Sequence, residues 1–210
     1  ESDYIDMKIL HISDTHGFHH DINQELPAAD VLVHSGDFTW GGSEAEAIDF
    51  MNWLIGLTQF RHKVFIAGNH DDCMYQADGI QGLPDNVHFL QHSSVVIDEI
   101  RFYGLPLYME DSISGRYEML IDEIPSDVEV LVSHQPPFGL LDITDYGNGL
   151  RNHGSKKLKD IVASYRPKAH LFGHEHSANG LIIENGIIYS NASLLDDSYK
   201  QTYNPRLIEI

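Results

Sequence analysis

The chain has 210 residues, of which 32 are acidic and 13 basic, and its formal net charge is −19. Such a surface repels nucleic acids and anionic membranes, which argues against a nucleic-acid scaffold, although bound metal ions can reverse the sign locally for a small anionic substrate. The single cysteine, Cys73, excludes an internal disulfide framework, and no apolar run reaches the roughly 20 residues that span a bilayer.

This length suits one domain over residues 1–210 with a core of its own. The first residues lack the basic start and apolar middle of a signal peptide, so we expect Met7 to be the natural start and residues 1–6 to be an artificial addition. Together with the lone cysteine, this favours a reducing, cytoplasmic location. We expect no membrane partner, and we leave a homo-oligomer open.

The predicted elements alternate along the early chain and cluster as strands along the late chain. Helical periodicity covers 44–57, 155–165 with Ser155 as its N-cap, and more weakly 113–122. Asn185-Gly186 is a strong hairpin signal. The pattern predicts an α/β architecture of mixed sheets packed together, with helices outside. The strand-like runs are 7–13, 30–35, 63–68, 94–100, 101–105, 129–134, 168–173, 180–184, 187–191 and 206–210.

Polar residues follow five of these strands at their carboxyl ends, where ligand sites of α/β sheets gather. One such ending is unremarkable, whereas five together favour a shared site over ordinary loop composition. His174 and His176 are two positions apart, and in an extended backbone alternate side chains share a face. The residues are Asp14 and His16 after the first strand, Asp37 after the second, Asn69, His70 and Asp71 after the third, His134 after 129–133, and His174 and His176 after 168–173.

The types of side chain in this set point to metal binding. Carboxylate, imidazole and amide oxygen without thiolate suit Mn²⁺, which we favour, or Fe, Zn²⁺, Co²⁺ or Ni²⁺. The candidate ligands exceed one tetrahedral site and fit two metals that share a carboxylate, an arrangement that polarises a phosphoryl group and activates a water. The candidates are Asp14, His16, Asp37, Asn69, His134, His174 and His176, three of them preceded by glycines that leave room beside a metal (Gly36, Gly68 and Gly173).

In this order the motifs resemble those of the calcineurin-like metallophosphoesterase superfamily, and more narrowly the MPPED-type metallophosphoesterase-domain family. The blocks are Asp14-Thr15-His16, Gly36-Asp37, Gly68-Asn69-His70-Asp71, His134 and Gly173-His174-Glu175-His176. The narrower similarity rests on stretches such as ISDTHG (12–17), SHQPPFGLLD (133–142) and NPRLIEI (204–210), and it covers nearly the whole chain. The resemblance implies a sandwich of two mixed β-sheets flanked by helices.

The resemblance also implies a role for each residue of the set. One metal would be held by Asp14, His16 and His176, a second by Asn69, His134 and His174, and Asp37 would bridge the two. His70 and Asp71 would be catalytic: His70 would lie beside the substrate phosphate and either stabilise the transition state or protonate the leaving oxygen, and Asp71 would orient His70 or a neighbouring loop.

We therefore expect a metal-dependent phosphoric ester hydrolase in which a metal-bound hydroxide attacks small phosphodiesters, including cyclic nucleotides. A phosphomonoesterase or nucleotidase, a nucleotide-binding protein with negligible turnover, and a purely structural metal protein remain alternatives. Asn69 and His70 would also contact the substrate. Arg151, in a glycine-rich segment before a helix, would clamp a phosphate oxygen, and a plain surface loop is an equal alternative.

Several other residues have simpler interpretations. His19 and His20 are expected to be exposed loop histidines that do not line the site. Phe38, Trp40 and Cys73 are expected to pack in the core. The sequon Asn191-Ala192-Ser193 is attributed to chance, and histidines inside predicted strands are expected to be satisfied core residues (His11, His34 and His170).

Overall fold

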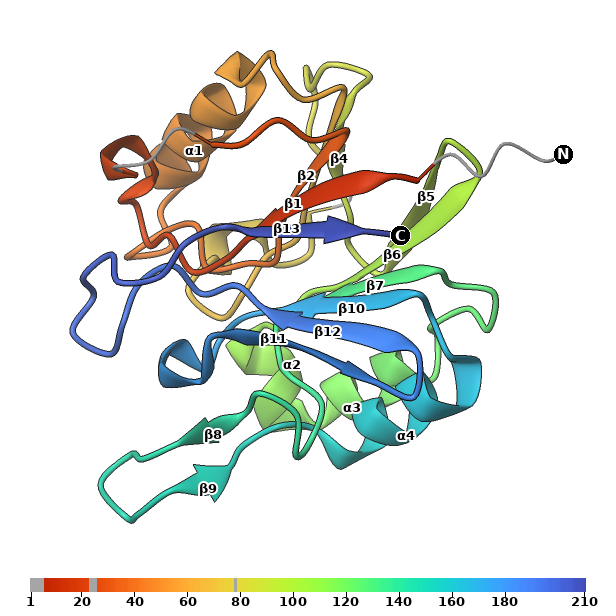
Figure 1. The fold of residues 1–210 in the computed structure, drawn as a ribbon. Helices are drawn as coiled ribbons and strands as arrows, with labels where there is room; N and C mark the ends of the chain where they lie inside the picture. The colour runs from red at the N-terminus through yellow and green to blue at the C-terminus, as the bar shows by residue number, and fades with distance from the viewer. Residues whose placement is uncertain (1–5, 23–25, 78) are drawn as a thin grey trace, which may run out of the picture.

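The computed structural model describes residues 6–22, 26–77 and 79–210, so the expected addition at residues 1–6 lies almost wholly outside the described part (Figure 1). Two β-sheets lie face to face at the centre, and helices cover their outer faces. The strand orders are β13-β1-β2-β3-β4 and β11-β12-β10-β7-β6-β5. This confirms the expected sandwich of two mixed sheets flanked by helices.

The first sheet combines the amino-terminal strands with the last strand of the chain. Its strands are β1 (Lys8–Ile12), β2 (Val31–His34), β3 (His62–Phe65), β4 (Val87–Phe89) and β13 (Arg206–Glu209). The second sheet consists of β5 (Ser93–Ile97), β6 (Ile100–Leu105), β7 (Val130–Ser133), β10 (Ala169–Phe172), β11 (Gly180–Glu184) and β12 (Ile187–Asn191). A separate two-stranded sheet pairs β8 (Ile143–Thr144) with β9 (Arg151–Asn152).

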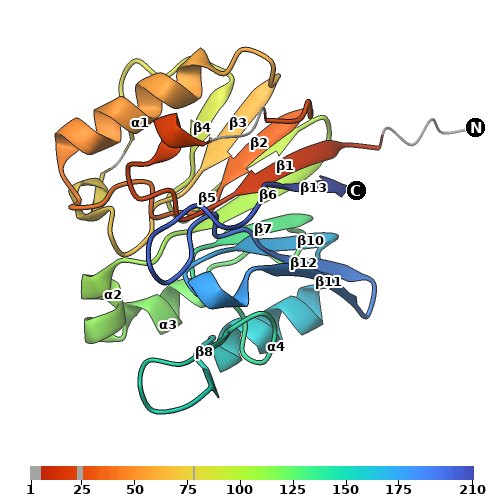
Figure 2. The same cartoon turned by 60° about the vertical axis from the view of Figure 1, so that its left-hand side comes forward.

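The helices lie on the two outer faces of the sandwich (Figure 2). The α-helices are α1 (Glu44–Gly56), α2 (Met109–Ser114), α3 (Arg116–Ile121) and α4 (Lys156–Tyr165), and the short 3₁₀ turns are η1 (His19–Asp21), η2 (Asp72–Met74) and η3 (His176–Ala178). Three apolar clusters fill the layers: one between the sheets, one between the first sheet and α1, and one between the second sheet and α3 and α4.

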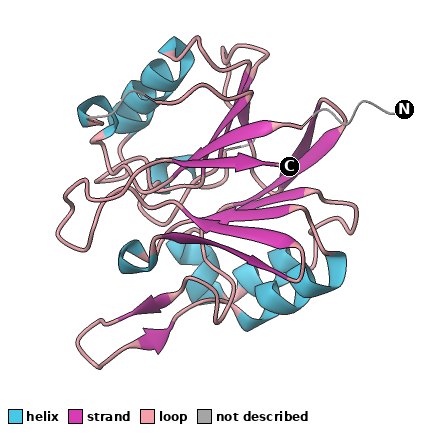
Figure 3. Cartoon of the chain, viewed as in Figure 1, coloured by secondary structure: helices cyan, strands magenta, loops and turns pink. Residues whose placement is uncertain are grey.

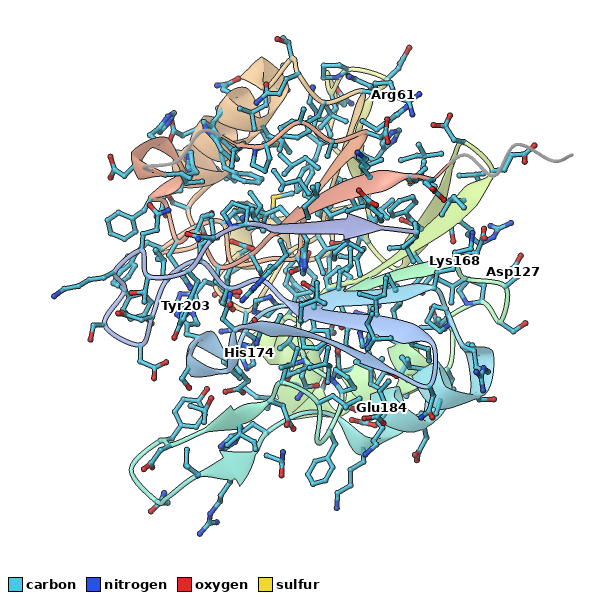
Figure 4. The ribbon with its side chains drawn as sticks, viewed as in Figure 1. Arg61, Asp127, Lys168, His174, Glu184 and Tyr203 are labelled. Atoms are coloured by element: carbon cyan, nitrogen blue, oxygen red, sulfur yellow. The ribbon has the colours of Figure 1, made fainter. Side chains whose placement is uncertain are left out.

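Strand direction explains how distant motifs come together. β1, β2 and β3 are parallel in one sheet, and β6, β7, β10 and β12 are parallel in the other. Their carboxyl ends open into loops at the same end of the sandwich (Figure 3). Lys168 and His174 mark the two ends of β10 in Figure 4, and His174 lies at the loop-rich end. The predicted strand-end motifs therefore face one region.

The predicted elements match the structure where their signals are strong. Helix α1 covers nearly the predicted range. The Ser155 hydroxyl caps α4 by accepting a hydrogen bond from the Leu158 N–H at 3.1 Å. Asn185 and Gly186 both have positive φ in the predicted hairpin turn. The weaker prediction of a helix over 113–122 is confirmed for α3, but the helix does not extend through the first residues of that range. Gly115, at φ 77°, separates α2 from α3, because a left-handed residue ends a helix.

Candidate metal centre

The structure brings together side chains from all five predicted strand ends. The Nε2 atoms of His16 and His176 are 3.2 Å apart. The His134 Nε2 lies 3.1 Å from the Asn69 Oδ1 and 3.3 Å from the His174 Nδ1. These side chains form two neighbouring groups that could each hold a cation, Asp14, His16 and His176 in one and Asp37, His134 and His174 in the other.

Asp37 lies between the two groups. Its Oδ2 is 3.7 Å from the His16 Nε2 and 3.3 Å from the His134 Nε2. Its Oδ1 accepts a hydrogen bond from the backbone N–H of His70 at 2.8 Å, which fixes the orientation of the carboxylate. A single carboxylate oxygen thus faces imidazoles of both groups, as a bridging ligand requires.

Backbone carbonyls orient three of the imidazoles. The Nδ1 atoms of His16, His134 and His176 lie 2.9–3.2 Å from the carbonyl oxygens of Thr39, Ser35 and Asp196 respectively. A carbonyl only accepts, so each Nδ1 must carry the proton, and in the neutral ring the Nε2 is left as a free lone pair. A hydrogen bond at Nδ1 fixes both the tautomer and the orientation of the ring, so that its Nε2 can bind a metal ion.

The types of donor atom in the two groups, and the distances between them, suit divalent cations. Two Nε2 atoms that face each other at 3.2 Å need a proton or a metal ion between them, because two lone pairs repel. The spacing also agrees with ligands about 2.0–2.1 Å from a shared ion. Asp14, His16, Asp37 and His134 are essentially buried, and buried carboxylates require positive partners.

The carboxylates and imidazoles of the two groups shift one another's pKa values. Burial alone opposes ionisation, yet the charge on His134 holds the pKa of Asp37 below its ordinary range, and the hydrogen bond with His176 does the same for Asp14. In return Asp37 raises the pKa of His134 to about 10, and Asp14 raises that of His176 to about 9, each against the effect of burial. Bound cations would displace these protons, so we expect metal affinity to rise with pH.

The backbone at the ligands is strained, a feature that the sequence did not indicate. Asp14, His16, Asp37 and His174 all have positive φ, between 42° and 71°. This conformation is unfavourable for residues with a Cβ, and it persists only where the surroundings enforce it. Strain concentrated on four candidate ligands is typical of a functional site.

Glycines provide the room that the ligands occupy, as predicted. A Cβ on Gly173 would overlap the Asp14 carboxylate and the Ser13 hydroxyl, and a Cβ on Gly68 would overlap the Asp37 carboxylate. Both glycines therefore allow backbone from one strand end to approach a carboxylate from another.

Asp71 supports the loop that follows β2 instead of contacting the His70 ring. Its carboxylate accepts from the backbone N–H groups of Asp37, Thr39 and Gly68 at 2.8–2.9 Å. Burial and the charge of Asp37 raise the pKa of Asp71, and these donors oppose that rise by favouring the ionised form. Of the two predicted alternatives, orienting a neighbouring loop is the one that agrees with these contacts.

His70 lines the cavity above the cluster. Its Nδ1 lies 3.0 Å from the Trp40 carbonyl oxygen and donates to it, and its ring is 4.7 Å from that of His16. The cavity of about 350 Å³ is also lined by Asn69, Tyr146 and Tyr199. A larger cavity of about 670 Å³ lies elsewhere, beside Tyr108 and Asp111, and contains none of the predicted ligands.

Arg151 is exposed on β9, opposite Thr144, and does not line the cavity. Its predicted role in clamping a phosphate stays a prediction.

Two other simple interpretations were wrong. His19 was expected to be exposed and is 2% exposed, because it packs beside Phe50 and Trp53 of α1. Trp40 was expected in the core and is 50% exposed, 4.6 Å from the ring of Tyr199. Phe38 is buried as expected.

Sequence reasoning missed several residues around the centre. The Ser193 hydroxyl donates to the Asp14 Oδ2 at 2.8 Å, and the Tyr146 hydroxyl donates to the buried Glu175 at 2.9 Å. Ser193 follows β12, another parallel strand, so the same strand-end rule would have found it. Its burial together with Asn191 leaves the sequon inaccessible to glycosylation in the folded chain.

The fold and the convergent metal-ligand groups define a metallophosphoesterase class of protein. The family model described as calcineurin-like phosphoesterase matches residues 7–178, and the chain belongs to this family.

Similar proteins cover most of the chain. It is 30% identical to metallophosphoesterase domain-containing protein 1 of Homo sapiens and of Mus musculus, over 95% of this chain and 69% of theirs. A UPF0046 protein of Caenorhabditis elegans is 29% identical over 97% of this chain and 81% of its own length. A solved crystal structure matches with a TM-score of 0.59 at 14% identity, covering 98% of this chain and 99% of that one, and supports the fold alone.

Proposed function

We propose that this chain is a dinuclear metal-dependent phosphodiesterase that hydrolyses small phosphodiesters, cyclic nucleotides among them, with Mn²⁺ as the favoured ion. The observation that carries the proposal is the position of Asp37, whose Oδ2 faces imidazoles of both ligand groups. A shared carboxylate of this kind is the feature that distinguishes a two-metal site from two separate sites.

Seven residues of the chain would hold the two metal ions. Asp14, His16 and His176 would hold one ion, and Asn69, His134 and His174 the other, with Asp37 between them. The ions, when bound, supply Lewis-acid polarisation of the phosphoryl group and activation of a water.

His70 would act on the leaving group. Its Nδ1–H is held by the Trp40 carbonyl, which leaves the Nε2 as the ring atom that would pass a proton to the leaving oxygen. Asp71 would be a positioning residue, since its carboxylate holds the backbone that carries Asp37.

The charges at the cavity support a diester over a monoester. Among the described residues that line it there is no lysine or arginine, and Asp145 and Asp197 contribute negative charge. A phosphomonoester carries close to two negative charges at neutral pH and a diester only one. Bound cations would attract both, but the described residues of the lining offer no lysine or arginine to hold the second charge of the monoester away from Asp145 and Asp197.

The proposal is tested by the turnover of bis-p-nitrophenyl phosphate and p-nitrophenyl phosphate with added Mn²⁺. We expect a higher kcat/KM on the diester, and we expect Asp37→Asn to remove activity while circular dichroism shows a folded chain. A preference for the monoester would favour the nucleotidase alternative. No turnover of either ester by folded wild-type protein, with Mn²⁺, Fe²⁺, Zn²⁺, Co²⁺ or Ni²⁺, would leave only binding or structural roles.

A further inference from the structure

We propose that His19, His20 and Asp49 form a third cation site, separate from the centre at the strand ends, that takes a borderline divalent ion such as Zn²⁺. We call these three residues the α1 histidine cluster. His19 and His20 belong to η1, and Asp49 lies on α1, so the site would join the loop after β1 to the helix. None of the three belongs to the predicted metal or catalytic set.

The donor atoms of the α1 histidine cluster already converge. The Asp49 Oδ2 is 3.0 Å from the His19 Nε2 and 3.1 Å from the His20 Nε2. All three donor atoms lie within 4.8 Å of one another. Ligands of a tetrahedral zinc ion at about 2.0–2.1 Å stand roughly 3.3 Å apart, so little rearrangement is needed.

His19 is held in place by packing. Its side chain is 1% exposed and its ring lies 5.3 Å from Trp53 and 5.6 Å from Phe50, ring centre to ring centre. Its Nδ1 is buried and has no hydrogen-bond partner among the described residues. A buried, fixed ligand loses little conformational entropy on binding an ion, whereas a free surface histidine would lose more.

Two ligands of the cluster remain accessible to an ion. The side chains of His20 and Asp49 are 56% and 57% exposed, and the cluster borders an open groove that His16 and Trp40 also line. Burial lowers the pKa of His19, and the hydrogen bond from His20 lowers the pKa of Asp49. Two imidazoles and one carboxylate with open positions suit zinc, nickel or cobalt better than calcium or magnesium.

An ion at this site would stabilise one wall of the groove next to the main centre. The loop that carries His16 continues through Gly17 and Phe18 into η1, and the ion would tie that segment to α1. The simpler alternative is that His19 and His20 only donate hydrogen bonds to Asp49.

Equilibrium dialysis against zinc buffered by a weak chelator, followed by zinc analysis per chain, separates these alternatives. We expect the wild type to hold one zinc more per chain than His20→Ala/Asp49→Asn. Only exposed residues are changed, so that folding is preserved. The matched control is His88→Ala, which breaks another pair of contacting histidines, His62 and His88 at 3.2 Å, that has no carboxylate; it should retain the wild-type zinc content.

Equal zinc content in the wild type and the double variant, or an equal loss in His88→Ala, would overturn the proposal. Hydrogen exchange gives a second measurement: zinc should slow amide exchange over residues 18–21 more in the wild type than in the double variant. Both measurements compare the wild type with variants in which the residues of the main centre are unchanged. They therefore hold whether or not the main centre binds two ions or hydrolyses a phosphoester.

Discussion

At the scale of single residues, the candidate centre depends on imidazoles whose proton positions are set by the backbone. His70 lines the same cavity as His174 and His176, with its Nδ1 on the Trp40 carbonyl, but it belongs to neither of the two proposed ligand groups. The side chain can therefore be removed without removing a ligand from either group.

We expect His70→Ala to lower kcat for the diester by about 10²-fold or more, since a positioned general acid contributes roughly 10²–10⁴-fold. Metal content should stay at the wild-type value. Steady-state kinetics and metal analysis check the two parts, with His88→Ala as a control histidine remote from the centre. Loss of the metals in His70→Ala would show that His70 is a ligand and that its assignment is wrong.

At the scale of elements, the site depends on strand ends that approach one another closely. Gly173 follows β10, and its backbone lies against Ser13 and Asp14, which follow β1 in the other sheet. The two sheets can therefore meet at this point only if residue 173 has no side chain.

We expect Gly173→Ala to destabilise the chain by about 1–3 kcal/mol, because the added Cβ displaces buried groups in a closely packed region. Displacement of Asp14 should also lower metal content. Urea unfolding and metal analysis measure both effects. The control is Gly56→Ala, where a Cβ meets no atom within 4 Å and the end of α1 gains a better helix former, so stability should be unchanged or slightly increased. Equal effects of the two substitutions would contradict this account of Gly173.

At the scale of the whole molecule, buried histidines link the stability of the fold to pH. His11 is fully buried between the sheets, His34 under α1 and His170 on the helix-covered side of the second sheet, and burial lowers the pKa of each to about 3. Their burial is as the sequence predicted, although the Nδ1 of His170 has no hydrogen-bond partner among the described residues. His11 also joins the two sheets, since its ring nitrogens lie 2.9 Å from the hydroxyls of Ser190 and Ser35. Protonating these rings favours the unfolded chain.

The pKa of each histidine is lower in the folded state than the ordinary value of 6.5, so the unfolded chain binds more protons between these two values. The stability that these three histidines contribute as neutral rings should be fully present above pH 6.5 and should fall as the pH drops toward 3, by up to about 1.4 kcal/mol per pH unit for each histidine.

Urea unfolding of the metal-stripped protein at several pH values measures this slope. His170→Gln is the informative variant, because it can keep the contact with the Ser133 hydroxyl and cannot take a charge. Its slope should be smaller than that of the wild type, and an unchanged slope would contradict the argument. A single transition would also support the prediction of one domain.

The sequence by itself determined the α/β class, the long strands, helices α1 and α4, and the set of polar residues that the structure brings together, because apolar periodicity and strand-end chemistry are local. It did not reveal the short β4, β8 and β9, which have two or three residues each and too little periodicity to detect.

Only the tertiary structure decided that the Asp37 carboxylate lies between the two ligand groups, and that the carbonyls of Ser35, Thr39 and Asp196 orient the imidazoles. Every residue has the same carbonyl, so no pattern of side chains can mark which one will meet a given imidazole. That choice depends on how the two sheets pack.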